Sequence, residues 1–140
     1  LLTKIITFTI RNQLLNNSNM KHKIWYDDKT GITFIEFVGD YLRKDVEEVI
    51  STVKEKFEGK PYKQLLTIMS IKDKVENRET REASSKGLAT TGATDIAFVG
   101  GSAANRMVAR VLIKTGVIKI NGDFFKSEEK AIEWLKSKRS

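Results

Sequence analysis

The 140-residue sequence predicts a single α/β domain, with a mixed, mostly parallel sheet of four or five strands packed against about four helices. Three observations support this class. The length suits one hydrophobic core and is short for two. Short apolar runs alternate with longer segments whose apolar residues recur at helical spacing. The resulting order, ββαβαβαβα, is typical of a parallel sheet with one antiparallel hairpin partner.

The first two strands are predicted to form a hairpin. His22, Ile24 and Tyr26 alternate with Lys23, Trp25 and Asp27 in a period-two pattern. Residues 28–31 then contain turn-forming Asp and Gly, and residues 32–38 are apolar, β-branched and aromatic. Trp25 and Tyr26 are adjacent, so one ring faces the core and the other faces outward. An exposed aromatic side chain on an edge strand is a candidate dimer contact.

The clearest helix covers residues 42–57. Its apolar residues fall at helical spacing with charged residues outside, and Gly59 follows as a stop signal. Residues 65–71 form a short apolar run with polar flanks, which predicts a buried strand.

The next helix, residues 76–88, is predicted to be poorly amphipathic. Its apolar content is Ala83, Gly87 and Leu88, and Ser and Thr residues crowd its end. We therefore expect it to bury little. A second buried strand follows at residues 96–99.

The third helix is predicted at residues 104–115, ending at Gly116. Arg106, Arg110 and Lys114 lie one turn apart on the face opposite its apolar stripe. The predicted stripe consists of Ala104, Met107, Val108, Val111, Leu112 and Thr115.

The last elements are predicted as a brief strand at 117–120, a turn at 121–123 and a helix capped by Ser127. Glu128 and Glu129 lie in the first turn of this helix, and basic residues lie at its end. Both placements match the helix dipole.

Composition narrows the functional classes. The chain has no Cys, which excludes disulfides and permits a cytoplasmic location. His22 is the only histidine, and in a strand pattern it is expected to be a packing or surface residue. The net charge of +7 arises from interleaved basic and acidic residues, which favours a solvated surface over nucleic-acid binding. No apolar run is long enough to cross a bilayer, and no metal or cofactor is expected.

Residues 1–19 differ in character from the rest of the chain. They contain no acidic residue, end in an Asn-rich stretch and make a poor signal peptide. We expect the domain to occupy residues 20–140. The preceding segment is expected to be loosely ordered or not native, arising as an extension, an added strand or amphipathic segment, or a mis-set start.

Three stretches together resemble one known family. They are IEFVGDYLRKDVEEVISTVKEKF (35–57), TDIAFVGGSAANRMVARVLIKTG (94–116) and FFKSEEKAIEWLKS (124–137). In this order they resemble STAS or SpoIIAA-like domains, which include bacterial anti-anti-sigma factors, and look especially like the uncharacterised bacterial STAS/SEC14 branch. The resemblance covers residues 20–139 and implies a SpoIIAA-like fold. SEC14-like relatives also imply an apolar ligand between sheet and helices, here in a small groove rather than a large lipid pocket.

The best-known chemistry of this family is phosphorylation of a serine in an Asp-Ser-Ser/Thr-Gly segment at the start of the second helix. The corresponding region here is DKVENRETREASSKG, with residues 77–81 where the motif would lie. It has no Asp-Ser pair, and Ser84 and Ser85 lie farther into the helix. We therefore do not expect a phosphorylation switch of that kind.

In open α/β sheets, ligands gather beyond the carboxyl ends of the strands. One such end is GGSAANR, residues 100–106, where helix N-terminal N–H groups would accompany polar side chains in an anion or ligand site. The candidate residues are Gly100, Gly101, Ser102, Asn105 and Arg106. The stretch lacks the features of a P-loop or a dinucleotide fingerprint. We favour the alternative that the glycines permit a tight turn and the serine caps the helix.

Other strand ends carry Asp40 and Asp73, which as paired carboxylates would suit general acid–base chemistry. The sequence shows no accompanying nucleophile pattern, so we favour cap and loop roles. The alternating charges that follow predict a solvated helix with internal ion pairs. A candidate interaction surface comprises Asp40, Lys72, Asp73, Asn77, Ser84 and Ser85.

The sequence supports three functional hypotheses. The first is a non-enzymatic regulatory or protein-interaction module, in which helix 76–88 and the strand-end loops contact a protein partner or a second copy of the chain. The second is a binding protein for an anion or apolar metabolite at the strand-end loops. The third, with least support, is an enzyme acting through Asp40 or Asp73.

Overall fold

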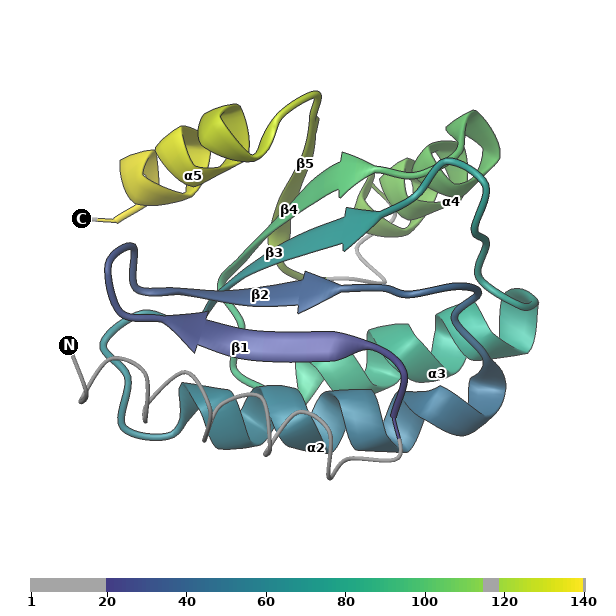
Figure 1. The fold of residues 1–140 in the computed structure, drawn as a ribbon, viewed down its shortest axis with the longest axis horizontal. Coiled ribbons are helices and arrows are strands. Elements are labelled where there is room, and N and C mark those ends of the chain that lie inside the picture. The colour runs from purple at the N-terminus through teal and green to yellow at the C-terminus, as the bar shows by residue number, and fades with distance from the viewer. Residues whose placement is uncertain (1–19, 115–118, 140) are drawn as a thin grey trace, which may run out of the picture.

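The computed structural model describes residues 20–114 and 119–139. Five strands form one sheet in the order β1-β2-β3-β4-β5, with β1 antiparallel to β2 and the other neighbours parallel (Figure 1). This confirms the predicted α/β class, the ββαβαβαβα order and the hairpin. The elements are β1 (Lys23–Asp27), β2 (Ile32–Glu36), a 3-10 turn η1 (Arg43–Asp45), α2 (Val46–Phe57), β3 (Gln64–Met69), α3 (Arg78–Ala89), β4 (Asp95–Gly100), α4 (Ala103–Lys114), β5 (Asn121–Phe125) and α5 (Glu128–Ser137). The predictions for residues 1–19 lie outside the described residues.

Two apolar clusters occupy the two faces of the sheet. On one face, α2 and α3 lie side by side and cover residues such as Ile35, Leu65 and Ile96 (Figure 1). On the other face, α5 covers a smaller cluster through Ala131 and Leu135. Alternate residues of each buried strand serve the two clusters, which is why these strands read as continuous apolar runs.

Helix α2 forms as predicted from Val46 onward, because its apolar residues share one face and are all buried, whereas residues 43–45 of the predicted helix form the 3-10 turn η1. Gly59 has a φ of 73° just beyond the helix, a left-handed conformation that glycine adopts without strain. Strand β3 ends at Met69, earlier than predicted. Ile71 instead lies in the following turn and is 74% exposed.

The hairpin aromatics differ in their surroundings. Trp25 stacks on Phe34 at a ring separation of 5.2 Å, and Tyr26 lies beneath the amine of Lys60. Both rings are half-buried on the edge strand β1. A dimer contact through either ring remains a prediction.

Helix α3 contacts its neighbours through small side chains rather than large apolar ones. Thr80, Ser85 and Leu88 are its buried residues, whereas Ala83 and Gly87 are half-buried. Leu88 is thus the only large apolar side chain that α3 buries, in agreement with the expectation that this helix buries little. The physical reason is that small residues let a helix approach its neighbours closely without a broad apolar stripe.

The predicted apolar stripe of α4 is wrong in its first turns. Ala104 is exposed and Met107 is 66% exposed, while Arg106, Ala109 and Ile113 are half-buried. Long Arg side chains can cover apolar surface with their stems, so a charged residue need not face solvent. The other predicted stripe residues, Val108, Val111, Leu112 and Thr115, and the predicted stop at Gly116, lie outside the described side chains or residues.

The three residues of the predicted basic face of α4 have different surroundings. The Arg106 guanidinium donates to the Gly101 carbonyl at 2.7 Å. The Arg110 guanidinium lies 4.8 Å from the ring centre of Phe124. Of the three predicted residues, Lys114 is exposed without such a contact in the described part of the chain.

The prediction for the last strand is wrong. Residues 121–123, predicted as a turn, begin β5, and residues 119–120 precede it. Residues 117–118 of the predicted strand lie outside the described part of the chain. The final helix begins as predicted, with the Ser127 hydroxyl accepting from the Lys130 N–H at 3.3 Å.

Strand β5 begins with Asn121, Gly122 and Asp123, residue types that usually form turns. The neighbours of Gly122 and Asn121 explain why these two occur in a strand. A Cβ on Gly122 would lie 2.6 Å from Cδ1 of Ile113 and 3.4 Å from Cγ2 of Ile96, so only glycine fits there without a shift. Asn121 donates from Nδ2 to Oδ1 of Asp95 at 3.0 Å. Gly122 and Asn121 are therefore explained by the residues that β5 packs against, and they do not indicate a turn.

Candidate functional site

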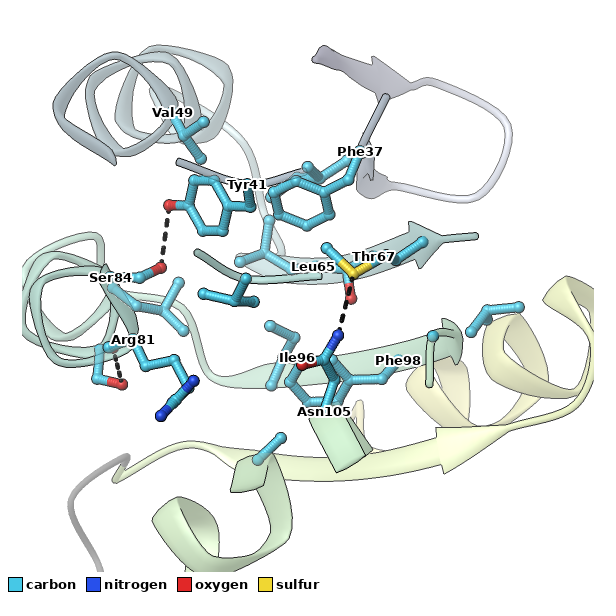
Figure 2. Close-up of a pocket in the computed structure, with 18 of the residues that line it drawn as sticks. Phe37, Tyr41, Val49, Leu65, Thr67, Arg81, Ser84, Ile96, Phe98 and Asn105 are labelled. Atoms are coloured by element: carbon cyan, nitrogen blue, oxygen red, sulfur yellow. Dashed lines mark hydrogen bonds between the residues drawn. The ribbon is translucent and has the colours of Figure 1, made fainter. Parts of the chain in front are cut away.

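A cavity of about 170 Å³ lies between the sheet and helices α2, α3 and α4 (Figure 2). Its lining is mainly apolar and includes aromatic rings from several elements. Leu65 and Ile96 contribute from the sheet, and Val49 contributes from α2. Phe37, Tyr41, Phe98 and Phe124 supply the rings.

The inward face of α3 explains why space remains at this point. Arg81, Ser84, Ser85 and Leu88 line the cavity, at the i, i+3, i+4 and i+7 positions of one helical face. Two of these four side chains are serines, which do not reach the sheet. The cavity therefore follows from small residues at positions where a buried helix usually carries large apolar ones.

The hydroxyl groups in the cavity wall are paired within the protein. Tyr41 Oη and Ser84 Oγ lie 3.0 Å apart, and Figure 2 shows this hydrogen bond between the Tyr41 ring and helix α3. Burial raises the pKa of Tyr41 to about 12, although the Ser84 hydrogen bond opposes the shift, so Tyr41 stays protonated at neutral pH. Ser85 donates to the Arg81 carbonyl at 2.9 Å, and Thr67 donates to the Ala97 carbonyl at 3.3 Å.

Arg81 is the exception among the polar groups of the lining. Within the described part of the chain, its half-buried guanidinium has no hydrogen bond or ion pair. Figure 2 shows it extending from α3 toward the side of the cavity where Asn105 lies. The expected internal pairing of this charged helix holds instead for Arg78, whose Nε donates to Oε1 of Glu82 at 2.9 Å.

The candidate ligand loop at residues 100–106 has the geometry of a turn and cap. Gly100 and Gly101 have φ values of 82° and 80°, and a Cβ on Gly100 would collide with the Met69 carbonyl oxygen. The Ser102 hydroxyl accepts from the Asn105 N–H at 3.1 Å. Four of these candidates, Gly100, Gly101, Asn105 and Arg106, also line the cavity.

Two side chains of this loop are engaged within the protein. Asn105 donates from Nδ2 to the Asp73 carbonyl at 3.4 Å, and the guanidinium of Arg106 holds the Gly101 carbonyl. A separate anion site formed by the loop alone would have to displace these contacts.

The residues of the predicted interaction surface separate into two groups. Asp40 and Asn77 support local structure, since Asp40 accepts from the Lys74 N–H at 3.0 Å and Asn77 caps α3 by accepting from the Thr80 N–H at 2.9 Å. Lys72 is exposed and Asp73 is half-buried in the same loop. Ser84 and Ser85, by contrast, line the cavity, so the structure does not join the six residues into one exposed surface.

Comparison with known proteins identifies the family. The profile described as "Domain of unknown function (DUF7793)" matches residues 24–139. The chain belongs to this family. No significant match was found among curated proteins.

A solved structure shows the fold. It is the crystal structure of an uncharacterized protein of the DUF3478 family with a SpoIIAA-like fold, from Shewanella loihica PV-4. The two are 17% identical with a TM-score of 0.56, and the alignment covers 84% of this chain and 97% of the other. The predicted SpoIIAA-like fold is confirmed.

Residues 20–114 and 119–139 contain no group of three or more His, Cys, Asp or Glu side chains placed to hold a metal ion. No helix among these residues is long and apolar enough to cross a membrane.

The resemblance implied a small groove between sheet and helices, but the sequence analysis did not identify Arg81 or the side chains that line the cavity. Ser84 and Ser85 were considered as substitutes for a phosphorylated serine and as part of an interaction surface. The available signal was the spacing of Arg81, Ser84, Ser85 and Leu88 in a helix that must cover a sheet. That spacing predicts an inward face with little side-chain volume and one cation.

Proposed function

We propose that this DUF7793 protein binds a small, largely apolar molecule in the cavity between the sheet and helices α2, α3 and α4. The observation that carries the proposal is the cavity itself, with about 170 Å³ of space and a mainly apolar lining. An apolar protein cavity of about 150 Å³ stays dry and binds benzene, so a molecule of about one aromatic ring fits this size.

The energetics of packing support a ligand here. Protein interiors are close-packed, and an unfilled apolar space costs stability because its lining loses dispersion contacts. A ligand that fills the space restores those contacts. The rings of Phe37, Tyr41, Phe98 and Phe124, which line the cavity, can also form edge-to-face contacts with an aromatic ligand.

This proposal develops the second sequence-based hypothesis and moves its site. The ligand lies between sheet and helices, with Gly100, Gly101 and Arg106 at its edge rather than as its main contacts. The proposed role is non-enzymatic, and a cytoplasmic location stays a prediction.

Two alanines of α4 allow a matched test. Ala109 lines the cavity, whereas Ala104, on the same helix, is exposed. Ala109→Leu places a larger side chain inside the cavity and reduces the space for a ligand, so we expect it to abolish binding of toluene. Ala104→Leu should leave binding unchanged. Saturable changes in the amide spectrum of the ¹⁵N-labelled protein would measure this, after native mass spectrometry has shown whether a ligand is retained on purification.

Failure of toluene to cause saturable changes in the wild type would contradict the proposal. Equal binding by both leucine variants would place any ligand elsewhere on the protein. Melting temperatures of the two variants show whether each remains folded.

A second candidate function is a protein-interaction module. Three of the four large hydrophobic residues exposed in the described chain, Val38, Ile71 and Met107, follow the carboxyl ends of β2, β3 and β4. Parallel strands bring these ends to one edge of the sheet. Exposed apolar residues gathered at one edge favour contact with a protein, and a second copy of the chain is the partner that purified protein can test.

The second candidate predicts a dimer that depends on this edge. Ile71→Asp combined with Met107→Asp should convert a dimer into a monomer in sedimentation velocity experiments, because it places charges in the contact. A wild type that stays monomeric at high concentration, or a dimer unchanged by the double substitution, would reject the self-association form of this candidate.

A further inference from the structure

We infer that the cavity ligand is a small aromatic carboxylate whose carboxylate group is held by Arg81. This inference rests on the proposed function, because it specifies the chemistry of a ligand in the same cavity. It goes further by naming the head group, the residue that binds it and the class of compound that is selected.

Most of the polar groups around the cavity have partners within the protein. Tyr41 and Ser84 pair with each other, Ser85 and Thr67 donate to backbone carbonyls, and Arg106 holds the Gly101 carbonyl. Among the described lining residues, the Arg81 guanidinium alone has a full set of N–H donors without a protein partner. Arginine presents its donors in a planar fork that matches the two oxygens of a carboxylate.

Arg81 lies at one end of the apolar space. Helix α3 follows the carboxyl end of β3, and Arg81 lies in its first turn, whereas Leu88 lies in its last turn. The cation is therefore near one end of the cavity and the wall beyond it is apolar. A ligand with one anionic end and one apolar end satisfies both parts.

The Ser84 hydroxyl lies next to the Arg81 guanidinium and can supply a further hydrogen-bond donor. Ser84 is three residues after Arg81, so the two side chains are neighbours on one face of α3. The Tyr41–Ser84 pair contains two hydroxyl hydrogens and uses one of them in its own hydrogen bond. When Tyr41 donates, the Ser84 hydroxyl is free to donate to a carboxylate oxygen that Arg81 also holds.

The size and lining of the apolar space limit the body of the ligand. The volume of about 170 Å³ accommodates one ring with a short substituent rather than a long acyl chain. Four aromatic rings line the space, which favours an aromatic over an aliphatic body.

The experiment compares phenylacetate with phenylacetamide, its neutral analogue of nearly the same shape, at neutral pH where the acid is ionised. Isothermal titration calorimetry on the full chain should give tighter binding of the acid by about 10- to 100-fold, the range expected for charged hydrogen bonds. Arg81→Gln should remove this preference by weakening the binding of phenylacetate. Arg78→Gln, on the same helix but exposed and paired with Glu82, should leave both affinities unchanged.

The outcomes separate this inference from the proposed function. Equal affinity of the wild type for acid and amide would overturn the inference and leave the proposed function standing. A preference that survives Arg81→Gln but is lost in Arg106→Gln would assign the head group to the other cavity arginine and also overturn it. Binding of neither compound would reject the ring-sized ligand and with it the inference.

A folding control accompanies the titrations. The melting temperature of Arg81→Gln should match that of the wild type, because the Arg81 guanidinium has no hydrogen-bond or ion-pair partner to lose in the described structure. Arg81→Lys keeps the charge without the planar fork and should retain only part of the preference. Full retention by Arg81→Lys would contradict the proposed two-point contact.

Discussion

At the scale of single residues, His22 shows how one buried polar group is satisfied. Its Nδ1 accepts a hydrogen bond from the Val38 N–H at 3.0 Å, so in the neutral ring the proton must lie on Nε2. That atom lies 3.1 Å from Oδ2 of Asp45 and donates to it. The lone histidine is thus a packing residue, as expected, and joins the start of β1 to the start of α2.

Burial also makes His22 a source of pH dependence. The ring is 3% exposed, and this burial lowers its pKa below the usual 6.5, although the hydrogen bond and charge of Asp45 oppose the shift. The unfolded chain therefore binds a proton more readily than the native protein below pH 6.5. It follows that the free energy of unfolding falls as the pH decreases from 6.5 toward the native pKa.

We predict that urea unfolding at pH 5.5 gives a lower free energy than at pH 7.5 for the wild type. His22 is the only histidine and the chain has no Cys, so no other side chain ordinarily titrates in this window. His22→Gln should be less stable at both pH values and should lose much less stability between them. An equal loss in both proteins would show that His22 is not the group responsible.

Asp45 extends this dependence to more acidic conditions. Burial alone would raise its pKa, but the Leu42 N–H and His22 stabilise the carboxylate and lower its pKa below the usual 3.8. The stability from this carboxylate is present above pH 3.8 and is lost as the pH falls through its native pKa. The losses due to His22 and Asp45 should therefore appear in separate pH ranges.

At the scale of elements, the contact between α2 and α3 depends on one glycine. A Cβ added to Gly87 would lie 2.6 Å from Cγ1 of Ile50, well inside contact distance. Glycine in a helix interior normally costs about 1 kcal/mol relative to alanine. Its presence here is explained by the close approach of the two helices that form one wall of the cavity.

We predict that Gly87→Ala destabilises the protein by about 1 to 3 kcal/mol, the opposite of the usual effect in a helix, because overpacking outweighs the gain in helix propensity. Chemical denaturation would measure this change. Ile50→Ala removes the atoms that clash, so the double variant should lose less than the sum of the two single losses. Stabilisation by Gly87→Ala alone would show that α2 and α3 separate without cost.

At the scale of the whole molecule, the two edges of the sheet have different roles. The cavity rim and the exposed Ile71 and Met107 lie toward the carboxyl ends of the strands. At the amino ends, a polar network joins distant parts of the chain. Gln64 on β3 donates to Oδ2 of Asp95 at 3.1 Å and to the Leu135 carbonyl of α5 at 2.7 Å.

Arg139 completes this network after the last helix. Its Nε donates to Oε1 of Gln64 at 2.9 Å, its Nη2 donates to the Thr30 carbonyl in the hairpin turn, and its guanidinium lies 4.0 Å from the ring centre of Tyr62. One side chain therefore joins α5 to the hairpin and to β3. Gln64 is 2% exposed, so the loss of Arg139 would leave a buried amide oxygen without a protein partner.

We predict that Arg139→Ala lowers the free energy of unfolding by about 2 kcal/mol and leaves phenylacetate affinity unchanged. The first effect follows from the lost hydrogen bonds, and the second from the position of Arg139 at the edge away from the cavity. Lys138→Ala, at an exposed neighbouring position, should change stability much less. A large loss of affinity in Arg139→Ala would show that the two edges are coupled.

Local sequence patterns determined most of the architecture. The alternation of residues 22–26, the one-sided apolar spacing of α2 and the Ser127 cap each depend on neighbours along the chain, and each was predicted correctly. The resemblance in three ordered stretches likewise predicted the SpoIIAA-like fold that the solved structure shows.

Tertiary structure alone decided β5, the orientation of α4 and the cavity. The glycine at position 122 is explained by the Ile113 side chain, which folding brings against it. The inward position of Arg106 depends on the turn formed by Gly100 and Gly101, whose carbonyl at Gly101 its guanidinium contacts. The cavity arises where the serines of α3 face a sheet that they do not reach. Periodicity reports that a face is buried, whereas the space left beside that face depends on the side chains of other elements, which local sequence does not contain.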